Sequence, residues 1–188
     1  MAAICAIFSQ LAVLKIQALI TVEFIHTSAY HGRIITVNLK SITYGIIMSH
    51  DTKFSTDKAP KPVGLYPHAR KVGNLLFLSG VGPRQAGTTD IPGVTLNDDG
   101  SIQSYDIEAQ CRSVFENVKT ILEESGSSWM ELVDVTVFLT NMKDDFKTYN
   151  KIYAEYFADN QPCRTTVEIN CLPTPIAIEL KCIATIKE

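Results

Sequence analysis

The feature that most restricts the fold is a change of hydrophobic period between residues 107 and 140. Apolar residues first recur every three or four positions, which is the spacing of one buried face of an α-helix. Residues 133–140, VDVTVFLT, then alternate between apolar and polar, as in a strand with one buried face. The predicted helix face consists of Ile107, Cys111, Val114, Phe115, Val118, Ile121 and Leu122. The predicted inward face of the strand consists of Val133, Val135, Val137 and Leu139.

Signals for the two helix ends support this interpretation. Ser104 or Asp106 can cap the first turn, because short polar side chains accept hydrogen bonds from unpaired backbone N–H groups there. Gly126 can end the helix, since glycine readily adopts the left-handed conformation that follows a last turn. Residues 82–103 are rich in Gly, Pro, Asp and Thr and contain the turn cluster NDDGS, so we predict a long loop before the helix.

The remaining patterns complete an α+β domain. GNLLFLSG, at 73–80, is a short apolar run between glycines and is typical of a buried strand. The order strand, helix, strand, helix, strand, strand indicates a layer of helices on one face of a sheet. The second helix carries an apolar stripe of Phe146, Tyr149, Tyr153, Tyr156 and Phe157, and the last two strands span about 164–171 and 176–186.

Composition narrows the class of protein. With 188 residues, 46% hydrophobic and 20% charged, the chain suits one globular domain with an appendage. The net charge of −3 disfavours nucleic acid or an anionic membrane as the main partner. Five cysteines without paired spacing indicate reduced, mostly buried thiols in a reducing compartment. We therefore expect a cytoplasmic protein.

Residues 1–47 differ from the rest of the chain. They contain two apolar stretches but no uninterrupted run of the ~20 residues that a membrane span needs. They match a secretory signal only weakly, since no charge precedes Lys15, and a mitochondrial presequence would be richer in arginine. Met48 begins a polar, proline-containing segment that looks like an ordinary protein start. We predict a domain at 48–188 and a dispensable extension at 1–47. The extension is either a targeting segment or an upstream in-frame artefact, and a genuine presequence would indicate a mitochondrial location.

Polar residues on the last two strands indicate a site. Along 164–171 the odd positions are the more apolar, so Arg164 and Thr166 belong to the other face. Along 176–186 the even positions are apolar, which leaves Glu179 on the opposite face. Strand alternation therefore predicts that Arg164 and Glu179 lie on one side of the sheet, away from the helices.

Phe138 and Ile183 fall on the same predicted face as Glu179. A sheet face that mixes charge with large apolar groups is seldom simply exposed to water. We therefore expect this face to form a contact between subunits.

Four motifs together resemble the RidA/YjgF family of reactive-intermediate deaminases over about 62–187. They are GLYPHARKVGNLLFLSG, VDVTVFLTNMKDDFKTYN, PCRTTVEINCLP and IELKCIA, in the order and spacing of that family. The resemblance implies a chorismate-mutase-like α+β domain, with a mixed sheet and two helices on one face, that forms a homotrimer with active sites between subunits. Within the family, YPHAR, Arg84 after the SG turn and the long loop resemble the 2-aminomuconate deaminase branch.

The resemblance also implies which residues form the site. Carried over residue by residue, the functional positions of the family fall on Tyr66, Ser79, Asn150, Arg164 and Glu179. Thr166 replaces the site cysteine of many members, which puts any mechanism that needs a thiol in doubt.

Each candidate has a structural alternative. Arg164 either pairs with Glu168 or uses its planar guanidinium to bind a substrate carboxylate in two places. Glu179 either neutralises Lys181 or deprotonates the water that attacks a C=N carbon. Ser79 is either a turn residue or a hydroxyl donor.

Four further residues have supporting roles at most. Tyr66 is expected to be a pocket wall, Asn150 to orient neighbouring backbone, and His68 to line the pocket. Arg84 is predicted to bind the second carboxylate of a dicarboxylate substrate, because Arg164 can hold only one of the two well.

No cofactor and no metal are expected. Pro162-Cys163 looks like the opening of the P-C-x-x-C half of a zinc-dependent deaminase site, but Thr166 stands at the second cysteine position. No H-x-E motif follows any histidine, and neither a glycine-rich phosphate loop nor a nucleophile elbow is present in the sequence.

These observations predict a cofactor-free hydrolytic deaminase of a carboxylate-bearing enamine or imine. The favoured substrate is 2-aminomuconate, converted to the 2-oxo or enol dicarboxylate and ammonia. One alternative is a broad-range 2-iminoacid deaminase, and another is a non-enzymatic chaperone-like or RNA-associated role. The acidic balance disfavours RNA.

Overall fold

The structure, a computed structural model, describes residues 25–30, 33–38 and 51–186. By its internal contacts the chain divides into two compact units, Met1–Met48 and Ser49–Glu188.

Within the first unit, strands β1 (Ile25–Tyr30) and β2 (Arg33–Asn38) form an antiparallel pair. Ile25 is opposite Asn38, and Tyr30 is opposite Arg33. The rest of the predicted extension at 1–47 lies outside the described residues.

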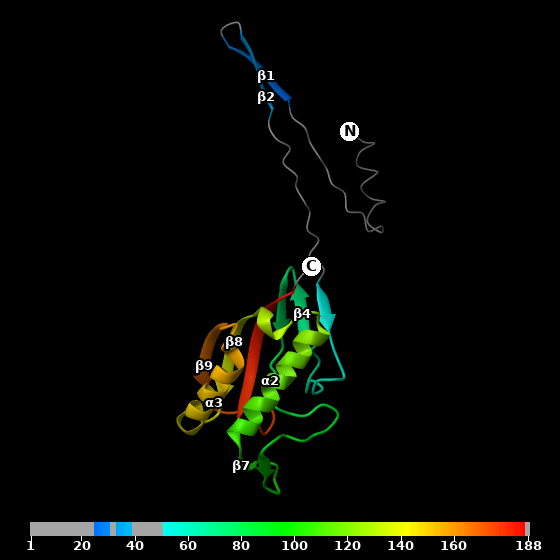
Figure 1. The fold of residues 1–188 in the computed structure, drawn as a ribbon. Helices are drawn as coiled ribbons and strands as arrows, with labels where there is room; N and C mark the ends of the chain where they lie inside the picture. The colour runs from blue at the N-terminus through cyan, green and yellow to red at the C-terminus, as the bar shows by residue number, and fades with distance from the viewer. Residues whose placement is uncertain (1–24, 31–32, 39–50, 187–188) are drawn as a thin grey trace, which may run out of the picture. The chain divides into compact units, whose positions relative to one another are not determined.

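The second unit is built on a mixed sheet of six strands in the described residues. Their order in the sheet is β3 (Thr52–Phe54), β4 (Ala69–Val72), β5 (Leu75–Leu78), β10 (Ile178–Thr185), β8 (Leu132–Leu139) and β9 (Cys163–Glu168). Neighbouring strands are antiparallel except β8 and β9, which are parallel because a helix crosses between them. Helices α2 (Ile107–Glu124) and α3 (Met142–Phe157) cover one face of the sheet (Figure 1). The predicted α+β fold is confirmed.

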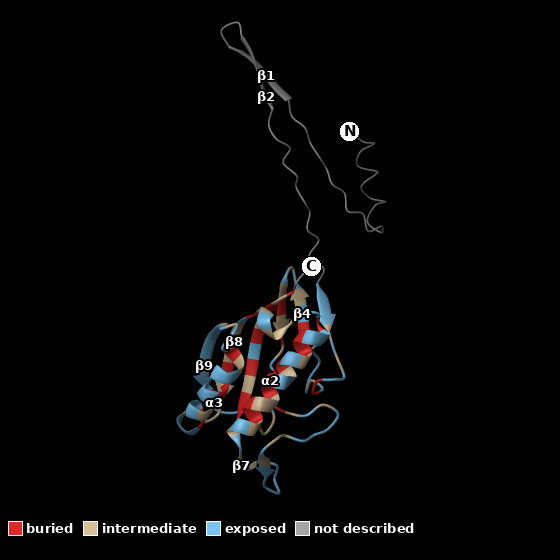
Figure 2. Ribbon diagram, in the orientation of Figure 1, coloured by how far each residue is buried: buried red, intermediate tan, exposed pale blue. Residues whose placement is uncertain are grey.

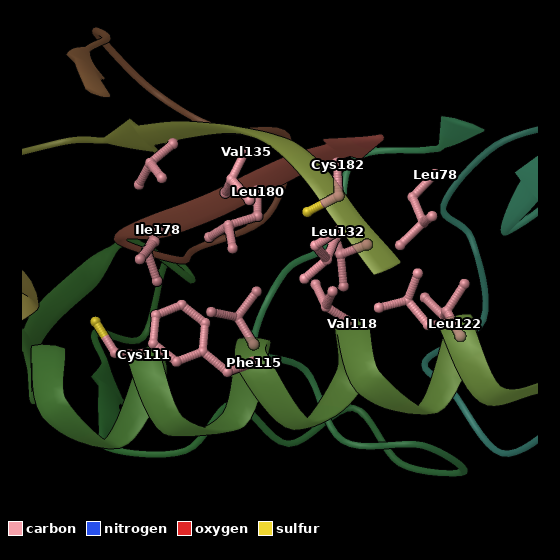
Figure 3. Packing of buried hydrophobic residues seen from close by; sticks show 14 of the residues in the cluster. Leu78, Cys111, Phe115, Val118, Leu122, Leu132, Val135, Ile178, Leu180 and Cys182 are labelled. Carbon is pink, nitrogen blue, oxygen red and sulfur yellow. The ribbon is translucent and has the colours of Figure 1, made fainter. Parts of the chain in front are cut away.

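Helix α2 supplies the centre of the hydrophobic core. Its predicted apolar face lies against β5, β8 and β10, and Phe115 points at Ile178 and Leu180 (Figure 3). Figure 2 shows that the buried residues are concentrated on these facing surfaces. Six of the seven predicted helix positions are buried, and only Ile107, in the first turn, is partly exposed.

Both ends of α2 match the sequence signals. Oδ1 of Asp106 accepts hydrogen bonds from the N–H groups of Glu108, at 2.9 Å, and Ala109, at 3.2 Å. After the last turn, Gly126 has a φ of 80°, where a side chain would strain the backbone. Of the two predicted caps, Asp106 is therefore the one that acts.

Strand β8 departs from strict alternation at its start. Val133, predicted to point inward, is 44% exposed, whereas Leu132 is buried. The register with β10 shifts here: Asp134 is opposite Ile183, but Leu132 is opposite Ala184. Val133 is thus an extra residue at a β-bulge, which returns the buried position to Leu132. The inward prediction for Val133 was wrong.

The segment 82–103 is more ordered than the predicted long loop. It contains β6 (Val94–Leu96) and the first half of β7 (Ile102–Tyr105), which pair as an antiparallel hairpin. NDDGS forms the hairpin turn, with Gly100 at a φ of 81°. The Tyr105 hydroxyl donates to Oδ2 of the buried Asp145 at 2.8 Å and so attaches the hairpin to α3.

Helix α3 buries most of its predicted stripe. Tyr149 and Phe157 are buried together with Ile152, and Tyr153 and Tyr156 pack partly buried against the core. Phe146 was predicted to belong to the stripe but is 37% exposed. Neither α2 nor α3, among the described residues, is long and apolar enough to cross a membrane.

The cysteines are less uniformly buried than predicted. Cys111 and Cys182 lie in the core, but Cys163 and Cys171 are exposed, and none of the four is in a disulfide. Cys5 lies outside the described residues.

Replacing the acting cap of α2 tests this account of the fold. We expect Asp106→Ala to lower the free energy of unfolding by about 1 kcal/mol, because two N–H groups lose their acceptor. Ser104→Ala, which changes the exposed alternative cap, is the control and should have little effect. Urea denaturation followed by circular dichroism measures both, and a larger loss for Ser104→Ala would contradict the assignment.

Candidate active site

The predicted site residues fall into two places in one chain. Four of them line a small pocket of about 30 Å³, called here the loop pocket. It is formed by Pro60, Pro62, Tyr66, His68, Ser79, Gly80, Val81, Gly82, Arg84 and Ile121. Arg164 and Thr166 line an open groove of about 490 Å³ between α3 and β9, called here the α3–β9 groove, and Asn150 contacts Arg164 beside it. It is formed by Met142, Lys143, Phe146, Lys147, Arg164 and Thr166.

In the loop pocket, Ser79 and His68 are engaged with backbone. The Ser79 hydroxyl donates to the Pro67 carbonyl at 2.7 Å, so in this arrangement it offers a ligand lone pairs rather than a proton. Nδ1 of His68 accepts from the Thr56 N–H at 3.2 Å, and Nε2–H donates to the Pro60 carbonyl at 3.0 Å. Because both ring nitrogens are used, His68 is a wall of the pocket and not an acid or base.

Arg84 and Tyr66 form the outer part of the same pocket. Nη2 of Arg84 donates to the Lys61 carbonyl at 2.9 Å, which holds two parts of the rim together. Tyr66 is 43% exposed, beside the fully exposed Leu65. Tyr66 lies in the lining of the pocket. The guanidinium of Arg84 already donates one of its hydrogen bonds to a backbone carbonyl.

Two residues of α2 hold the Arg84 segment in place and were missed in the sequence. Nδ2 of Asn117 donates to the carbonyls of Gly82 and Arg84, at 2.9 and 2.8 Å. The Ser113 hydroxyl donates to the Pro83 carbonyl at 2.7 Å. Ser113 and Asn117 are four residues apart beside the apolar stripe, and this spacing is the signal that could have identified them.

Glu179 lies against Gly80, at the edge of the loop pocket. A methyl group on Gly80 would overlap the Glu179 carboxylate, so the carboxylate lies directly against this glycine. The side chain is half-buried, and this burial raises the pKa of the carboxyl group above its usual value. None of the ion pairs in the described residues includes Glu179, so Lys181 does not neutralise it.

Arg164 lies on the helix side of the sheet, contrary to the prediction. In the parallel register of β8 and β9, Arg164 is opposite Val135, which is buried beneath the helices. Glu179 is opposite Phe138, on the other side. The reason is that β9 is an edge strand, mostly exposed on both faces, so its weak apolar alternation does not identify the face that meets the helices.

Arg164 is held by α3 rather than by an acidic residue. Nη1 donates to Oδ1 of Asn150 at 2.8 Å. The guanidinium carbon lies 4.6 Å from the ring centroid of Tyr153 and 5.7 Å from that of Tyr149. These are cation–π contacts, which orient a cation without neutralising it. Tyr149 and Tyr153 were expected only in the apolar stripe, and their part in the site was missed.

The proposed pairing of Arg164 with Glu168 does not occur. Oε2 of Glu168 instead accepts from the Met142 N–H at 2.7 Å, at the start of α3. No ion pair of the described residues includes Arg164. The charged fork is therefore available to an anionic ligand in the groove.

Thr166 lies beside Arg164 on the same face of β9. Burial raises the pKa of Tyr149, while Arg164 and the Thr166 hydroxyl lower it, so these groups face one another. Thr166 thus lines the groove next to the guanidinium. In the part of the chain that the structure describes, no group of His, Cys, Asp and Glu is arranged to hold a metal.

Comparison with known proteins identifies the family of the chain. The family model described as "Endoribonuclease L-PSP" matches residues 56–186. A RutC family protein of Pyrococcus abyssi is 42% identical over 129 residues, covering 69% of this chain and 92% of that protein. The chloroplastic Reactive Intermediate Deaminase A of Arabidopsis thaliana is 40% identical over 132 residues, covering 70% of this chain and 64% of that protein.

Solved structures show the same fold. The YjgF gene product of E. coli covers 72% of this chain and 99% of its own, with a TM-score of 0.62 and 30% identity. A protein described as a putative endoribonuclease from Thermotoga maritima covers 73% and 98%, with a TM-score of 0.62 and 37% identity. The chain therefore belongs to the endoribonuclease L-PSP family, which includes the RutC family proteins and the reactive intermediate deaminases.

Proposed function

We propose that this protein is a cofactor-free hydrolytic deaminase of a carboxylate-bearing enamine or imine, with 2-aminomuconate as the substrate. The observation that carries the proposal is Arg164: a guanidinium fixed by Asn150 and two tyrosine rings, with no acidic partner in the described residues. A planar, oriented guanidinium is suited to two parallel hydrogen bonds with a carboxylate. The membership of reactive intermediate deaminases in the same family supports this reaction class.

The chemistry needs a carboxylate clamp and a group that moves a proton. The enamine first tautomerises to the imine, and Arg164 holds the adjacent carboxylate. Glu179 takes a proton from water as the oxygen adds to the C=N carbon, and it returns that proton to nitrogen, which gives a carbinolamine. Glu179 then transfers the hydroxyl proton to the amine nitrogen, so that the C–N bond breaks, ammonia leaves and a ketone remains. The raised pKa of Glu179 makes its carboxylate a stronger base than an exposed one. Fixing substrate and water together supplies proximity.

We further propose that the two groups meet between neighbouring copies of the chain. Arg164 and Glu179 lie on opposite sides of the sheet in one chain. The side that carries Glu179 also carries Phe138, Ile183 and Phe77, all partly exposed. Packing this face against another copy would bury its apolar groups and bring Glu179 of one copy to the groove of the next. A homotrimer, as implied by the resemblance, satisfies this requirement.

Ammonia release tests the proposed reaction. We expect turnover of 2-aminomuconate, and we expect Arg164→Ala to lower kcat/KM by about tenfold to a hundredfold, since one charged contact is lost. Arg112→Ala, which changes an exposed arginine of α2, is the matched control and should leave kcat/KM unchanged. Absence of ammonia from 2-aminomuconate, with release from simple iminoacids, would favour the broad-range deaminase instead.

Mixing two impaired variants tests the location of the site between copies. Arg164→Ala should retain at most about a tenth of wild-type kcat/KM when assayed alone, and Glu179→Gln should be similarly impaired. In an equimolar, re-assembled mixture, about a quarter of the sites should combine an intact Arg164 with an intact Glu179 from different copies. We expect that fraction of wild-type activity in the ammonia assay. No recovery, despite verified exchange of subunits by mass spectrometry, would show that both groups act within one chain.

The raised pKa of Glu179 predicts a pH-dependent effect on stability. Because the folded protein holds this proton more tightly than the unfolded chain, the ionised carboxylate destabilises the fold as pH rises through the raised pKa. Glu179→Gln should therefore increase the free energy of unfolding near neutral pH. The gain should vanish below the ordinary carboxyl value of 4.5.

Denaturant titrations over a pH series measure this difference. Glu116→Gln, at an exposed position of α2, is the control and should show no such pH dependence. A stability difference for Glu179→Gln that is constant with pH would contradict the burial argument.

A further inference from the structure

The α3–β9 groove contains more positive charge than one substrate carboxylate requires. Lys143 and Lys147 line it together with Arg164. The two lysines are four residues apart on α3, so they project from the same side of the helix. Phe146, which is 37% exposed, and Met142 add apolar surface between the cations.

The nearby acidic residues are already engaged. Glu168 accepts from the Met142 N–H at the start of α3. Asp144 accepts from Nδ2 of Asn141 at 2.8 Å, and Asp145 accepts from Tyr105 at 2.8 Å. None of the ion pairs formed by the described residues involves Lys143 or Lys147. The lining of the groove itself contains these three cations and no acidic residue, so an anionic ligand placed there would contact positive charge.

We infer that Lys147, assisted by Lys143, binds a second carboxylate and selects dicarboxylate substrates. This inference rests on the proposed function, in which Arg164 holds the first carboxylate. A chain with a carboxylate at each end would place its apolar middle on Phe146 and Met142. The assignment replaces Arg84, whose Nη2 already donates to the Lys61 carbonyl.

A ratio of activities measures this selectivity. The substrates are the imine of glutamate, which has two carboxylates, and the imine of 2-aminobutyrate, which has one, each generated in the assay by an amino-acid oxidase. We expect Lys147→Met to lower kcat/KM for the dicarboxylate about threefold, and Lys143→Met with Lys147→Met about tenfold, because both contacts are partly exposed to solvent. The monocarboxylate should change by less than about twofold.

Two variants serve as comparisons. Lys151→Met, one helical turn beyond Lys147 and not part of the groove lining, should leave the ratio unchanged. Arg84→Met should also leave it unchanged. Equal effects of the double variant on both substrates, or a change of ratio for Arg84→Met, would overturn the inference.

Equilibrium binding separates this inference from the proposed reaction. Calorimetry with 2-oxoglutarate and 2-oxobutyrate, which are the products of the two imines, requires no turnover. We expect tighter binding of 2-oxoglutarate to the wild type and loss of that preference in the double lysine variant. If neither imine releases ammonia, the binding preference alone decides the inference, whereas the proposed function is decided by ammonia release from 2-aminomuconate. Equal binding of the two oxo acids by the wild type would overturn it.

Discussion

The packing of α2 on strand β10 determines where the chemical groups of this domain lie. β10 is hydrogen-bonded to β5 on one side and to β8 on the other, and its even-numbered residues are buried beneath the helix. With Ile178 and Leu180 fixed inward by contact with Phe115, the residue between them must point away from the core. The packing of Ile178 and Leu180 in the core therefore sets the position of Glu179. Its partial burial and its raised pKa follow from that position.

Arg164 is positioned by a different principle. An arginine on an edge strand would ordinarily extend into solvent, with several rotatable bonds to lose on binding a ligand. Asn150 and the rings of Tyr149 and Tyr153 restrict it before any ligand arrives. Such restriction lowers the entropic cost of recognition, so a single charged contact can contribute more to affinity than a mobile one. Both tyrosines also pack in or against the hydrophobic core. The orientation of Arg164 therefore depends on the stable packing of α3.

Much of the fold followed from the sequence, since strong periodicity and capping chemistry are local properties. The α2 face, its Asp106 cap and the inward side of β10 are all encoded within a few residues of where they act. Val133 was misplaced because a bulge depends on the register with β10, which no local pattern contains. The strands of the 82–103 segment were missed because runs of three or four residues do not establish a period.

The site was harder to predict than the fold. The sequence indicated the residue types that bind a carboxylate and move a proton, but not their arrangement. The prediction of which face of β9 meets the helices was wrong. That face is set by α3, which lies over one side of the strand, and the weak apolar alternation of an edge strand does not indicate such a long-range contact. Ser113 and Asn117 looked like ordinary polar helix residues, since their function is to hold backbone carbonyls distant in sequence.

The central place of β10 has a consequence for how the domain forms during synthesis. β10 is the last strand of the described residues, yet it lies between β5 and β8, which the ribosome produces earlier. Until translation has passed Thr185, β5 and β8 have no strand between them, and the apolar face of α2 has only part of its partner surface. The nascent chain must therefore carry exposed core residues until a late insertion completes the sheet. This order of events makes folding slow relative to a domain with local pairing and gives chaperones a defined period in which to act.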